Sequence, residues 1–238
     1  IEFSKSEDKE GQIINHIANI IVNEKLDKKP SFNVPKVPDT DEIKYEDGTK
    51  QIFEQRGAKG LADWILSEKR LLLTDTTMRD AQQSLMATRM RTIDMSRIAA
   101  STAKLVPEMF SFEMWGGATF DTAMRFLNES PWERLRTLRE LMPNVLLQML
   151  VRGANAVGYK NYPDNVIRKF IKESCEAGID VIRIFDSLNW IPGLEIALDE
   201  TLNQGRIAEA SICYTGDLLD ETRDKYTIDY YVKKAKQL

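Results

Sequence analysis

The residues most able to do chemistry lie together in the segment 75–84, which reads DTTMRDAQQS. An apolar run precedes this segment, so a strand leaves the core and at once presents two carboxylates, the guanidinium of Arg79 and the amides of Gln82 and Gln83. A carboxylate next to an arginine suits a divalent metal together with a substrate that carries an anionic oxygen. The same pair could instead be an ion pair that fixes the first strand-to-helix loop. The residue types alone leave both interpretations open.

Four other polar side chains are candidates for the same site. Arg152 follows the apolar run Val145–Leu150 and is either a second positive charge in the site or a partner in a surface ion pair. Asp121, after a Gly-Gly pair, is either an acceptor for a ligand or the N-cap of a helix. Tyr159 is either a stacking platform or part of ordinary loop packing, and Asp186 ends a strand, a position that also suits a polar site residue.

Histidine and cysteine are too rare in this sequence for the usual metal and disulfide sites. The only histidine is His16, and the two cysteines are Cys175 and Cys213. A single histidine excludes a multi-histidine metal site within this sequence, and we expect His16 on a helix face. Two cysteines cannot form a disulfide framework, which favours a reducing, cytoplasmic setting. We expect Cys213 inside the fifth strand as a small core residue.

The elements that must position these side chains follow a repeating strand–helix order. Apolar, β-rich runs start about 30–40 residues apart, the size of a βα repeat. The expected strands are Leu71–Thr76, Phe110–Trp115, Val145–Leu150, Val181–Phe185 and Ser211–Tyr214. The expected helices are Asp94–Leu105, Asp121–Asn128, Glu133–Met142, Asp164–Ala177, Gly193–Asn203 and Ile228–Leu238. Alternating strands and helices predict a parallel sheet with right-handed crossovers.

Two α/β architectures have this order, an open doubly wound sheet and an eight-fold βα barrel. All five expected strands end in polar or aromatic residues, as in a barrel, where the carboxyl end of every strand faces the same mouth. Neither a GxGxxG nor a Walker loop is present. The pattern therefore favours the first five βα units of a TIM-type (β/α)8 barrel, which would need about 100 further residues to close.

The first fifty residues differ in character from the rest. Gln12–Val22 has the apolar spacing of an amphipathic helix, and the segment 28–49 carries prolines among charged residues, which is typical of an extended linker. The isoleucine face of the helix needs a partner, either the following domain or a region outside this chain. A second helix is expected over Gln51–Glu68, broken at Gly57 and Gly60. Because the chain begins with isoleucine rather than methionine, we expect a piece of a longer protein.

Composition excludes several classes of protein. Of 238 residues, 42% are apolar, which excludes disorder of the whole chain. The net charge of −4 argues against a nucleic-acid partner, because such proteins normally carry a basic excess. No stretch approaches the roughly 20 apolar residues that cross a bilayer, so no membrane partner is expected either.

Four stretches carry a recognisable pattern: DTTMRDAQQSLMATRMRT (75–92), EMWGGATFD (113–121), LVRGANAVGYKNYP (150–163) and RIFDSLNW (183–190). Together they resemble the carboxyltransferase domains of biotin-dependent enzymes that act on pyruvate or oxaloacetate. Upstream, the first helix, the Pro-rich linker and GTKQIFEQRGAKGLADW (48–64) resemble the connector of the pyruvate carboxylase family. The alternatives are a subunit of an oxaloacetate decarboxylase or transcarboxylase, which should lack this connector, and a non-catalytic half-barrel that serves as a binding module.

The resemblance implies roles for six residues. Asp80 is implied as a metal ligand, Arg79, Gln83 and Arg152 as the catalytic residues that hold pyruvate and its enolate, and Asp121 and Tyr159 as residues on the biotin side of the pocket. The implied reaction transfers the carboxyl group of carboxybiotin to the enolate of metal-polarised pyruvate and gives oxaloacetate. Family members commonly have histidine where this chain has Gln82, and this position is not expected to coordinate the metal.

The resemblance also implies cofactors, partners and a domain boundary. Residues 1–47 correspond to an inter-domain connector with part of a tetramerisation region, and residues 48–238 to an incomplete carboxyltransferase domain. The implied cofactors are biotin on a carrier domain outside this chain, a divalent metal (Zn or Mn), and ATP with Mg in a biotin carboxylase domain of the same protein, which would be a homotetramer. The family's other metal ligands, a carbamylated lysine and two histidines, and its proton-relay threonine would follow Leu238. We therefore expect the isolated chain to be inactive.

Overall fold

The structure, a computed structural model, describes residues 9–23, 35–218, 220, 222 and 224–238. The chain divides into two compact units, residues 1–36 and residues 37–238. Pro30 and the rest of the expected linker before residue 35 lie outside the described residues. No helix in the described part of the chain is both long and apolar enough to cross a membrane.

The first unit contains one described helix, α1 (Lys9–Asn23), which confirms the helix expected there. Its apolar side chains are exposed, Ile14 and Ile21 most of all. His16 is also exposed on this helix, as expected for a histidine on a helix face.

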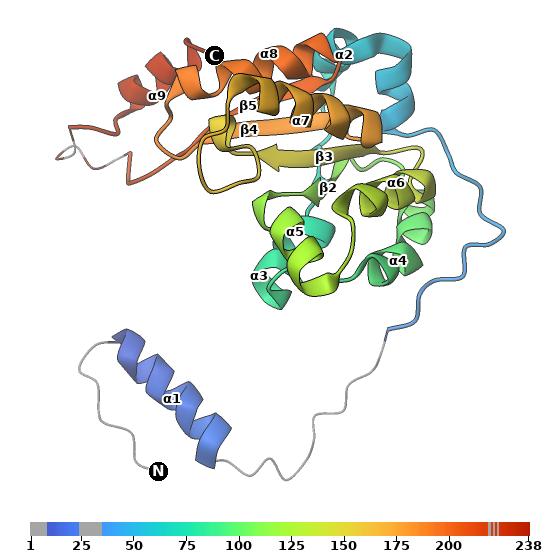
Figure 1. Cartoon of the computed structure of the whole chain (residues 1–238), viewed down its shortest axis with the longest axis horizontal. Coiled ribbons are helices and arrows are strands. Elements are labelled where there is room, and N and C mark those ends of the chain that lie inside the picture. Colours follow the sequence, from blue (N-terminus) through green and yellow to red (C-terminus); the bar gives the residue numbers. More distant parts are fainter. Residues whose placement is uncertain (1–8, 24–34, 219, 221, 223) are drawn as a thin grey trace. The chain divides into compact units, whose positions relative to one another are not determined.

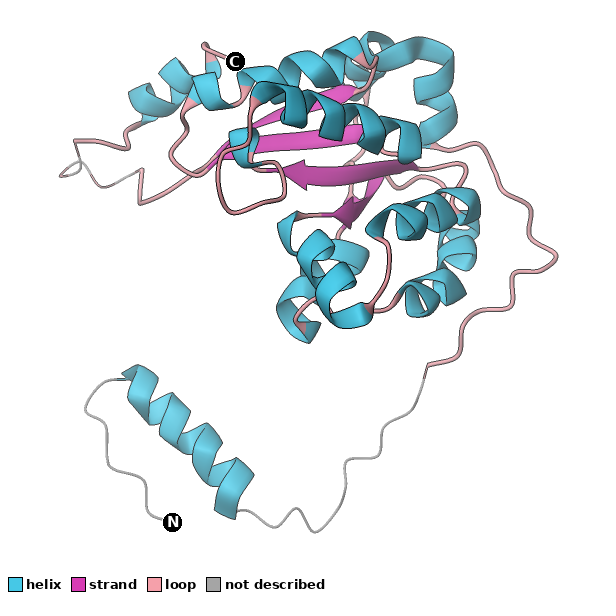
Figure 2. Ribbon diagram, viewed as in Figure 1, coloured by secondary structure: helices cyan, strands magenta, loops and turns pink. Residues whose placement is uncertain are grey.

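The second unit is built on one parallel sheet of five strands, coloured magenta in Figure 2. The strands are β1 (Thr74–Asp75), β2 (Ser111–Trp115), β3 (Leu146–Val151), β4 (Val181–Asp186) and β5 (Ile207–Ile212). Their order in the sheet is their order in the chain, and every neighbouring pair is parallel. A doubly wound sheet reverses direction at a switch point, whereas a barrel always adds the next strand on the same side. The observed order is therefore that of five consecutive βα units of a barrel.

Helices connect the strands and lie along the outer face of the sheet; α7 and α8 lie side by side there (Figure 1). The helices of this unit are α2 (Thr49–Ser67), α3 (Gln82–Met86), α4 (Thr92–Leu105), α5 (Gly117–Thr122), α6 (Pro131–Leu141), α7 (Asp164–Ala177), α8 (Glu195–Asn203) and α9 (Ile228–Ala235). Short π-helical turns, η1 (Thr77–Ala81) and η2 (Ala123–Leu127), and 3-10 turns, η3 (Gly153–Asn155) and η4 (Ile191–Gly193), lie in the connections. Local chemistry explains several helix ends: Ser130 caps the first turn of α6 ahead of a proline, and Gly178 ends α7 with a φ of 126°.

The two faces of the sheet differ in chemistry. In β2, β3 and β4, the apolar residues at every second position, starting at Phe112, Leu147 and Ile182, belong to the apolar core between the sheet and its helices. Residues between such positions point to the other face, which is the interior side of a barrel. That interior is polar in part, because Glu113 and Gln148 are fully buried there.

Helix α2 closes the amino end of the sheet. Phe53 and Leu61 of α2 pack against Leu146 and Val181, the first residues of β3 and β4. The helix is kinked at Gly57, whose φ of 67° is left-handed, as the sequence predicted. The prediction of a second break at Gly60 was wrong, because the backbone is helical there.

Two expectations about the edges of the fold need correction. The fifth strand is Ile207–Ile212 rather than Ser211–Tyr214, so Cys213 follows the strand and is only half-buried. The expected start was wrong because Glu209 and the alanines beside it hide the strand pattern, and pairing with β4 decides the register.

Residues 38–47, expected within the linker, contact the sheet unit directly. The Thr40 hydroxyl lies 3.0 Å from that of Ser101, the Tyr45 hydroxyl donates to the carbonyl of Leu141, and Asn144 Nδ2 donates to a carbonyl of the same segment. These hydrogen bonds hold an otherwise extended segment against α4 and the loop after α6.

Candidate active site

The loop after β1 places Arg79 and Asp80 at the carboxyl end of the sheet. Asp75 accepts hydrogen bonds from the backbone and the hydroxyl of Thr77, at 2.9 and 3.0 Å, and so fixes the turn into η1. Of the two carboxylates in this segment, Asp75 is therefore held by its own loop, whereas the side chain of Asp80 is 54% exposed. Only Asp80 faces the mouth with a carboxylate open to a ligand.

Arg79 is nearly buried, with 7% of the residue exposed. Its Nη1 donates to Asp80 Oδ1 at 2.9 Å, and its Nη2 donates to Glu113 Oε1 at 2.6 Å. The Asp–Arg ion pair that the sequence analysis left open as an alternative is therefore present between Asp80 and Arg79, and it lies at the mouth. Burial raises the pKa of the Glu113 carboxyl above its ordinary value, although the hydrogen bond from Arg79 works in the opposite direction.

The Gly116–Gly117 pair brings a second arginine to the same place. A Cβ on Gly116 would lie 2.7 Å from Arg79 Cδ, and a Cβ on Gly117 would lie 1.9 Å from Arg152 Nη2. The two guanidinium side chains thus lie against neighbouring backbone units of one loop. Arg152 Nη2 also donates to the carbonyl of Val157 at 3.3 Å. Three segments far apart in the sequence therefore meet at the mouth.

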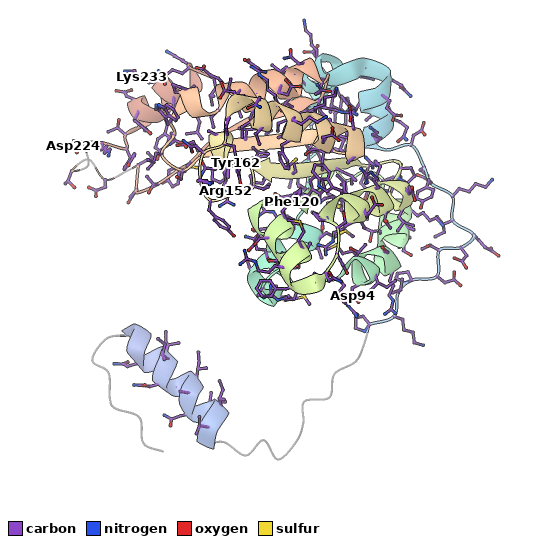
Figure 3. All side chains as sticks on the ribbon, in the orientation of Figure 1. Asp94, Phe120, Arg152, Tyr162, Asp224 and Lys233 are labelled. Carbon is purple, nitrogen blue, oxygen red and sulfur yellow. The ribbon has the colours of Figure 1, made fainter. Side chains whose placement is uncertain are left out.

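A cleft of about 440 Å³ opens next to Arg152, which contacts Val157 and Tyr159 of its lining, and the cleft includes both residues predicted on the biotin side. Asp121 forms an ion pair with Arg125 at 2.9 Å, and Tyr159 is 72% exposed with its ring 5.4 Å from the guanidinium carbon of Arg152. The cleft is lined by Phe120, Asp121, Met124, Arg125, Trp132, Ala156, Val157, Gly158, Tyr159, Tyr162, Val166 and Phe170. Figure 3 labels Phe120, Arg152 and Tyr162, which lie on this side of the sheet.

An aromatic cluster forms the floor of the cleft. Trp115 lies 4.7 Å from Phe120 and 5.0 Å from Trp132, both edge to face, and Phe120 lies 5.5 Å from Phe170. A register shift between Glu113 and Trp115 turns the end of β2 so that Trp115 joins this cluster. The cleft therefore combines an apolar floor with charged groups at its rim, as small-molecule sites usually do.

The remaining candidates have different positions. Gln83 Oε1 is buried and finds no hydrogen-bond partner among the described residues, which leaves an unused acceptor at the start of α3, directly after η1. Asp186 accepts from the backbone of Leu188 at 2.8 Å and of Trp190 at 3.0 Å, so its carboxylate shapes its own turn.

Comparison with known proteins identifies the group to which this arrangement belongs. No family model matches the chain. Pyruvate carboxylase of Bacillus subtilis (strain 168) is 54% identical over 243 aligned residues, covering 99% of this chain and 21% of that protein. The mitochondrial pyruvate carboxylase of Homo sapiens is 45% identical over 232 residues, covering 95% of this chain and 20% of that protein. The chain belongs to the pyruvate carboxylase family. It spans about a fifth of the length of the curated relatives it matches.

Solved structures of the same family agree over almost the whole chain. The carboxyl transferase domain of Rhizobium etli pyruvate carboxylase with oxamate and biotin has a TM-score of 0.84 and 48% identity, covering 97% of this chain and 40% of that one. The same domain with pyruvate and biocytin has a TM-score of 0.83 and 46% identity, covering 97% of this chain and 39% of that one. This agreement confirms the expected partial TIM-type barrel with a helical region before it.

The described residues do not by themselves form a metal site of the kind expected for a pyruvate carboxylase. Nowhere among residues 9–23, 35–218, 220, 222 and 224–238 do three His, Cys, Asp or Glu side chains lie close enough together to hold a metal ion. Asp80 offers one half-exposed carboxylate, and a metal needs further ligands. A complete site would therefore need further ligands besides those that the described residues bring together.

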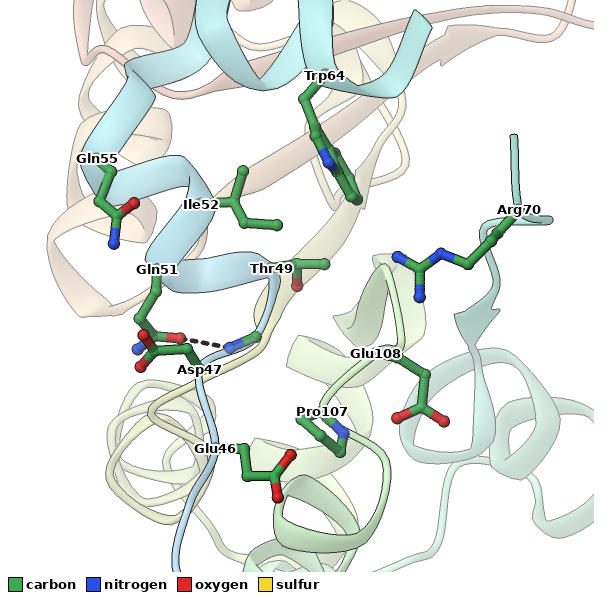
Figure 4. A pocket seen from close by; sticks show the side chains of 11 residues that line it. Glu46, Asp47, Thr49, Gln51, Ile52, Gln55, Trp64, Arg70, Pro107 and Glu108 are labelled. Atoms are coloured by element: carbon green, nitrogen blue, oxygen red, sulfur yellow. Dashed lines mark hydrogen bonds between the residues drawn. The ribbon is translucent and has the colours of Figure 1, made fainter. Parts of the chain in front are cut away.

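A second pocket, of about 390 Å³, lies at the other end of the sheet (Figure 4). It is lined by Glu46, Asp47, Gly48, Thr49, Gln51, Ile52, Gln55, Trp64, Arg70, Pro107 and Glu108. The Thr49 hydroxyl lies within hydrogen-bond distance of the carbonyls of Met109 and Phe110, just before β2, which places the pocket at the amino ends of the strands. Barrel enzymes carry their chemistry at the carboxyl ends, so we assign the candidate site to the mouth.

Sequence reasoning missed the polar residues of the barrel interior. Glu113, the buried partner of Arg79, lay within an expected strand and opened one of the recognised patterns, but it was given no role of its own. Further into the sheet, Arg183 Nε donates to Glu209 Oε1 at 2.8 Å, and Gln148 lies within 2.7 Å of the Ser111 hydroxyl. The available signal was alternation: Ser111 and Glu113 are polar at the positions between Phe112 and its apolar neighbours.

Proposed function

We propose that this chain is part of the carboxyltransferase domain of a pyruvate carboxylase, which transfers a carboxyl group from biotin to pyruvate and gives oxaloacetate. The observation that carries the proposal is the placement of the Arg79 and Arg152 side chains against the adjacent glycines of one loop at the barrel mouth. The Rhizobium etli carboxyl transferase domain, which has the same fold, is described with pyruvate and biocytin.

Two arginines and one amide would hold the substrate. Pyruvate is an anion, and removing a proton from its methyl group places further negative charge on the keto oxygen. The guanidinium groups of Arg79 and Arg152 and the amide of Gln83 can attract and orient both charges, and fixed donors of this kind stabilise a developing oxyanion. Asp80 would supply one ligand to a divalent metal, Zn or Mn. A metal bound there supplies Lewis-acid polarisation of the ketone.

The aromatic cleft would receive the cofactor that carries the carboxyl group. Asp121 has acceptor oxygens for a ureido N–H group, and Tyr159 has an exposed ring face at the rim. Tyr159 lies next to Arg152, and Asp121 lines the same cleft as Tyr159, so the two reactants would meet near the Gly116–Gly117 loop. Proximity of this kind removes much of the entropic cost of a two-substrate reaction.

The rest of the proposal concerns the complete protein. We place residues 1–47 in the connector and tetramerisation region and residues 48–238 in the carboxyltransferase domain. Biotin would be carried on another domain, loaded with ATP and Mg by a biotin carboxylase domain, in a cytoplasmic homotetramer. With one metal ligand among its described residues, the isolated chain should form no oxaloacetate.

The test uses the complete polypeptide with ATP, Mg2+, labelled bicarbonate and pyruvate, with and without avidin. Labelled oxaloacetate that depends on ATP and disappears with avidin is the expected result. In the same protein, Arg152→Ala should abolish carboxyl transfer while bicarbonate-dependent ATP cleavage continues. Decarboxylation of oxaloacetate without ATP-dependent synthesis would contradict the proposal and favour the decarboxylase alternative.

A further inference from the structure

We propose that Glu113 is the positioning residue for Arg79: from inside the barrel it fixes the direction in which that guanidinium faces the substrate. The inference rests on the proposed function for the role of Arg79 and goes beyond it by assigning a role to Glu113, a residue to which the sequence analysis gave none. Glu113 touches no open part of the mouth, because it is fully buried, so it would act only through the arginine.

The side chain of Arg79 is contacted on two sides, by the Glu113 carboxylate and by the backbone of Gly116. Glu113 Oε1 accepts from Arg79 Nη2 at 2.6 Å, the shortest of the arginine's two ion pairs. On another side the backbone of Gly116 approaches so closely that a Cβ there would lie 2.7 Å from Arg79 Cδ. Glu113 and Gly116 belong to the same strand-to-loop segment, so β2 and the residues after it determine where this side chain lies.

The strand supplies a fixed reference that the arginine's own segment lacks. Arg79 stands on η1, a single π-helical turn, and an arginine side chain has many rotamers, so the turn alone does not fix where its guanidinium lies. Glu113 is on a fully buried strand that is hydrogen-bonded on both sides, to β1 and to β3. A short charge-assisted hydrogen bond to such a strand restricts the arginine more than the exposed Asp80 can.

The charges of Glu113 and Arg79 favour a role for this ion pair in placing Arg79 rather than a role in stability alone. A buried carboxylate without a cation is costly, and replacing such a pair by apolar groups is often neutral for stability. Glu113 Oε2 and Arg79 Nε have no hydrogen-bond partner in the part of the chain that the structure describes. The Arg79–Glu113 pair is thus held by one short contact, Nη2 to Oε1, which fixes the guanidinium from the strand side.

The experiment compares three variants of the complete polypeptide: Glu113→Ala, Glu113→Gln and, as matched control, Glu209→Gln. Glu209 also lies on a strand and pairs with an arginine, Arg183, at 2.8 Å, but that arginine is not one of the mouth arginines. The measurements are kcat and KM for pyruvate in oxaloacetate formation, and bicarbonate-dependent ATP cleavage, which does not use this site.

Glu113→Ala should lower kcat/KM for pyruvate by about 10- to 100-fold, the cost of misplacing a binding group by about 1 Å. Glu113→Gln should recover most of this loss, to within about 5-fold of the unsubstituted protein, because the amide oxygen can still accept from Nη2. ATP cleavage should be unchanged in all variants, and Glu209→Gln should keep the original kcat/KM.

A double variant decides whether Glu113 acts through the arginine. In an Arg79→Ala background, adding Glu113→Ala should not weaken pyruvate binding further, as measured by a ligand-observed NMR titration. A further loss would overturn the inference, as would unchanged kinetics in Glu113→Ala or equal loss in the Ala and Gln variants. If Glu113→Ala does not fold, the Gln variant and the double variant still give the answer. Absence of pyruvate carboxylation in the unsubstituted protein would instead overturn the proposed function itself.

Discussion

Replacing Gly117 by alanine should misplace Arg152 without weakening the fold. Gly117 is the first residue of α5, and the added Cβ would lie 1.9 Å from Arg152 Nη2 and 2.7 Å from Cζ. The clashing atoms are the far end of a long side chain, which can swing aside at little cost. Alanine is also the better helix former, by about 1 kcal/mol in a helix interior. Stability should therefore stay the same or rise slightly.

The magnitude follows from the overlap. Ordinary contact begins near 3.4 Å, so Nη2 must move by about 3.4 − 1.9 = 1.5 Å. That displacement breaks the 3.3 Å hydrogen bond to the Val157 carbonyl and shifts the guanidinium from its place beside Tyr159. Because a misplacement of about 1 Å can cost roughly 100-fold in rate, we expect kcat/KM for pyruvate to fall by about that factor.

Kinetics and thermal unfolding of the complete polypeptide carry the test. The expected result is a large loss of oxaloacetate formation with an unfolding midpoint equal to or above that of the unsubstituted protein, and with bicarbonate-dependent ATP cleavage intact. Ala118→Gly, one residue along the same turn, is the control and should keep normal kinetics. If Gly117→Ala turned over pyruvate normally, the position of Arg152 against this loop would have no role in the reaction.

Three further predictions concern the rest of the fold. Asp180→Ala should destabilise the chain by about 3–5 kcal/mol in chemical denaturation, because it removes the buried carboxylate that Lys50 and Arg139 contact at 2.6 and 2.7 Å and leaves Lys50 only the exposed partner Glu54 at 3.6 Å. An unchanged midpoint would contradict this. Burial raises the pKa of Cys175 to about 11, so at pH 8 this thiol should resist a thiol reagent until denaturant is added, and rapid labelling of the native chain would count against its burial. Burial alone would raise the pKa of Glu129, but hydrogen bonds from Thr92 and Arg134 outweigh burial and lower this pKa in the folded protein. The ionised Glu129 therefore stabilises the fold above its unfolded-state pKa, and this stabilisation is lost as pH falls through the folded-state pKa. Glu129→Gln should therefore flatten the decline in unfolding free energy between about pH 5 and pH 3, and an unaltered decline would refute this.

The sequence by itself determined the order and type of most elements. The helix Asp164–Ala177 has the expected bounds, because a clear apolar period and a C-terminal glycine mark it locally. The strand before Arg152 was also visible, since buried parallel strands are apolar almost throughout. The strand before Arg79 was expected over Leu71–Thr76, but it is only Thr74–Asp75, and Leu71 and Leu73 are exposed. Local composition therefore placed both arginines at strand ends, and strand ends share one mouth in a barrel.

Tertiary structure alone decided which of those groups touch. The contact between Arg79 and Glu113 joins residues 34 apart, and it depends on the register of β1 against β2. The approach of Arg152 to Gly117 depends on the register of β3 against β2, including the shift at Trp115. Periodicity reports which face of an element is apolar, but not how far neighbouring strands are offset. That offset is set by hydrogen bonding and packing across the whole sheet, so only the fold shows that the Gly116–Gly117 pair is the surface against which two arginines lie.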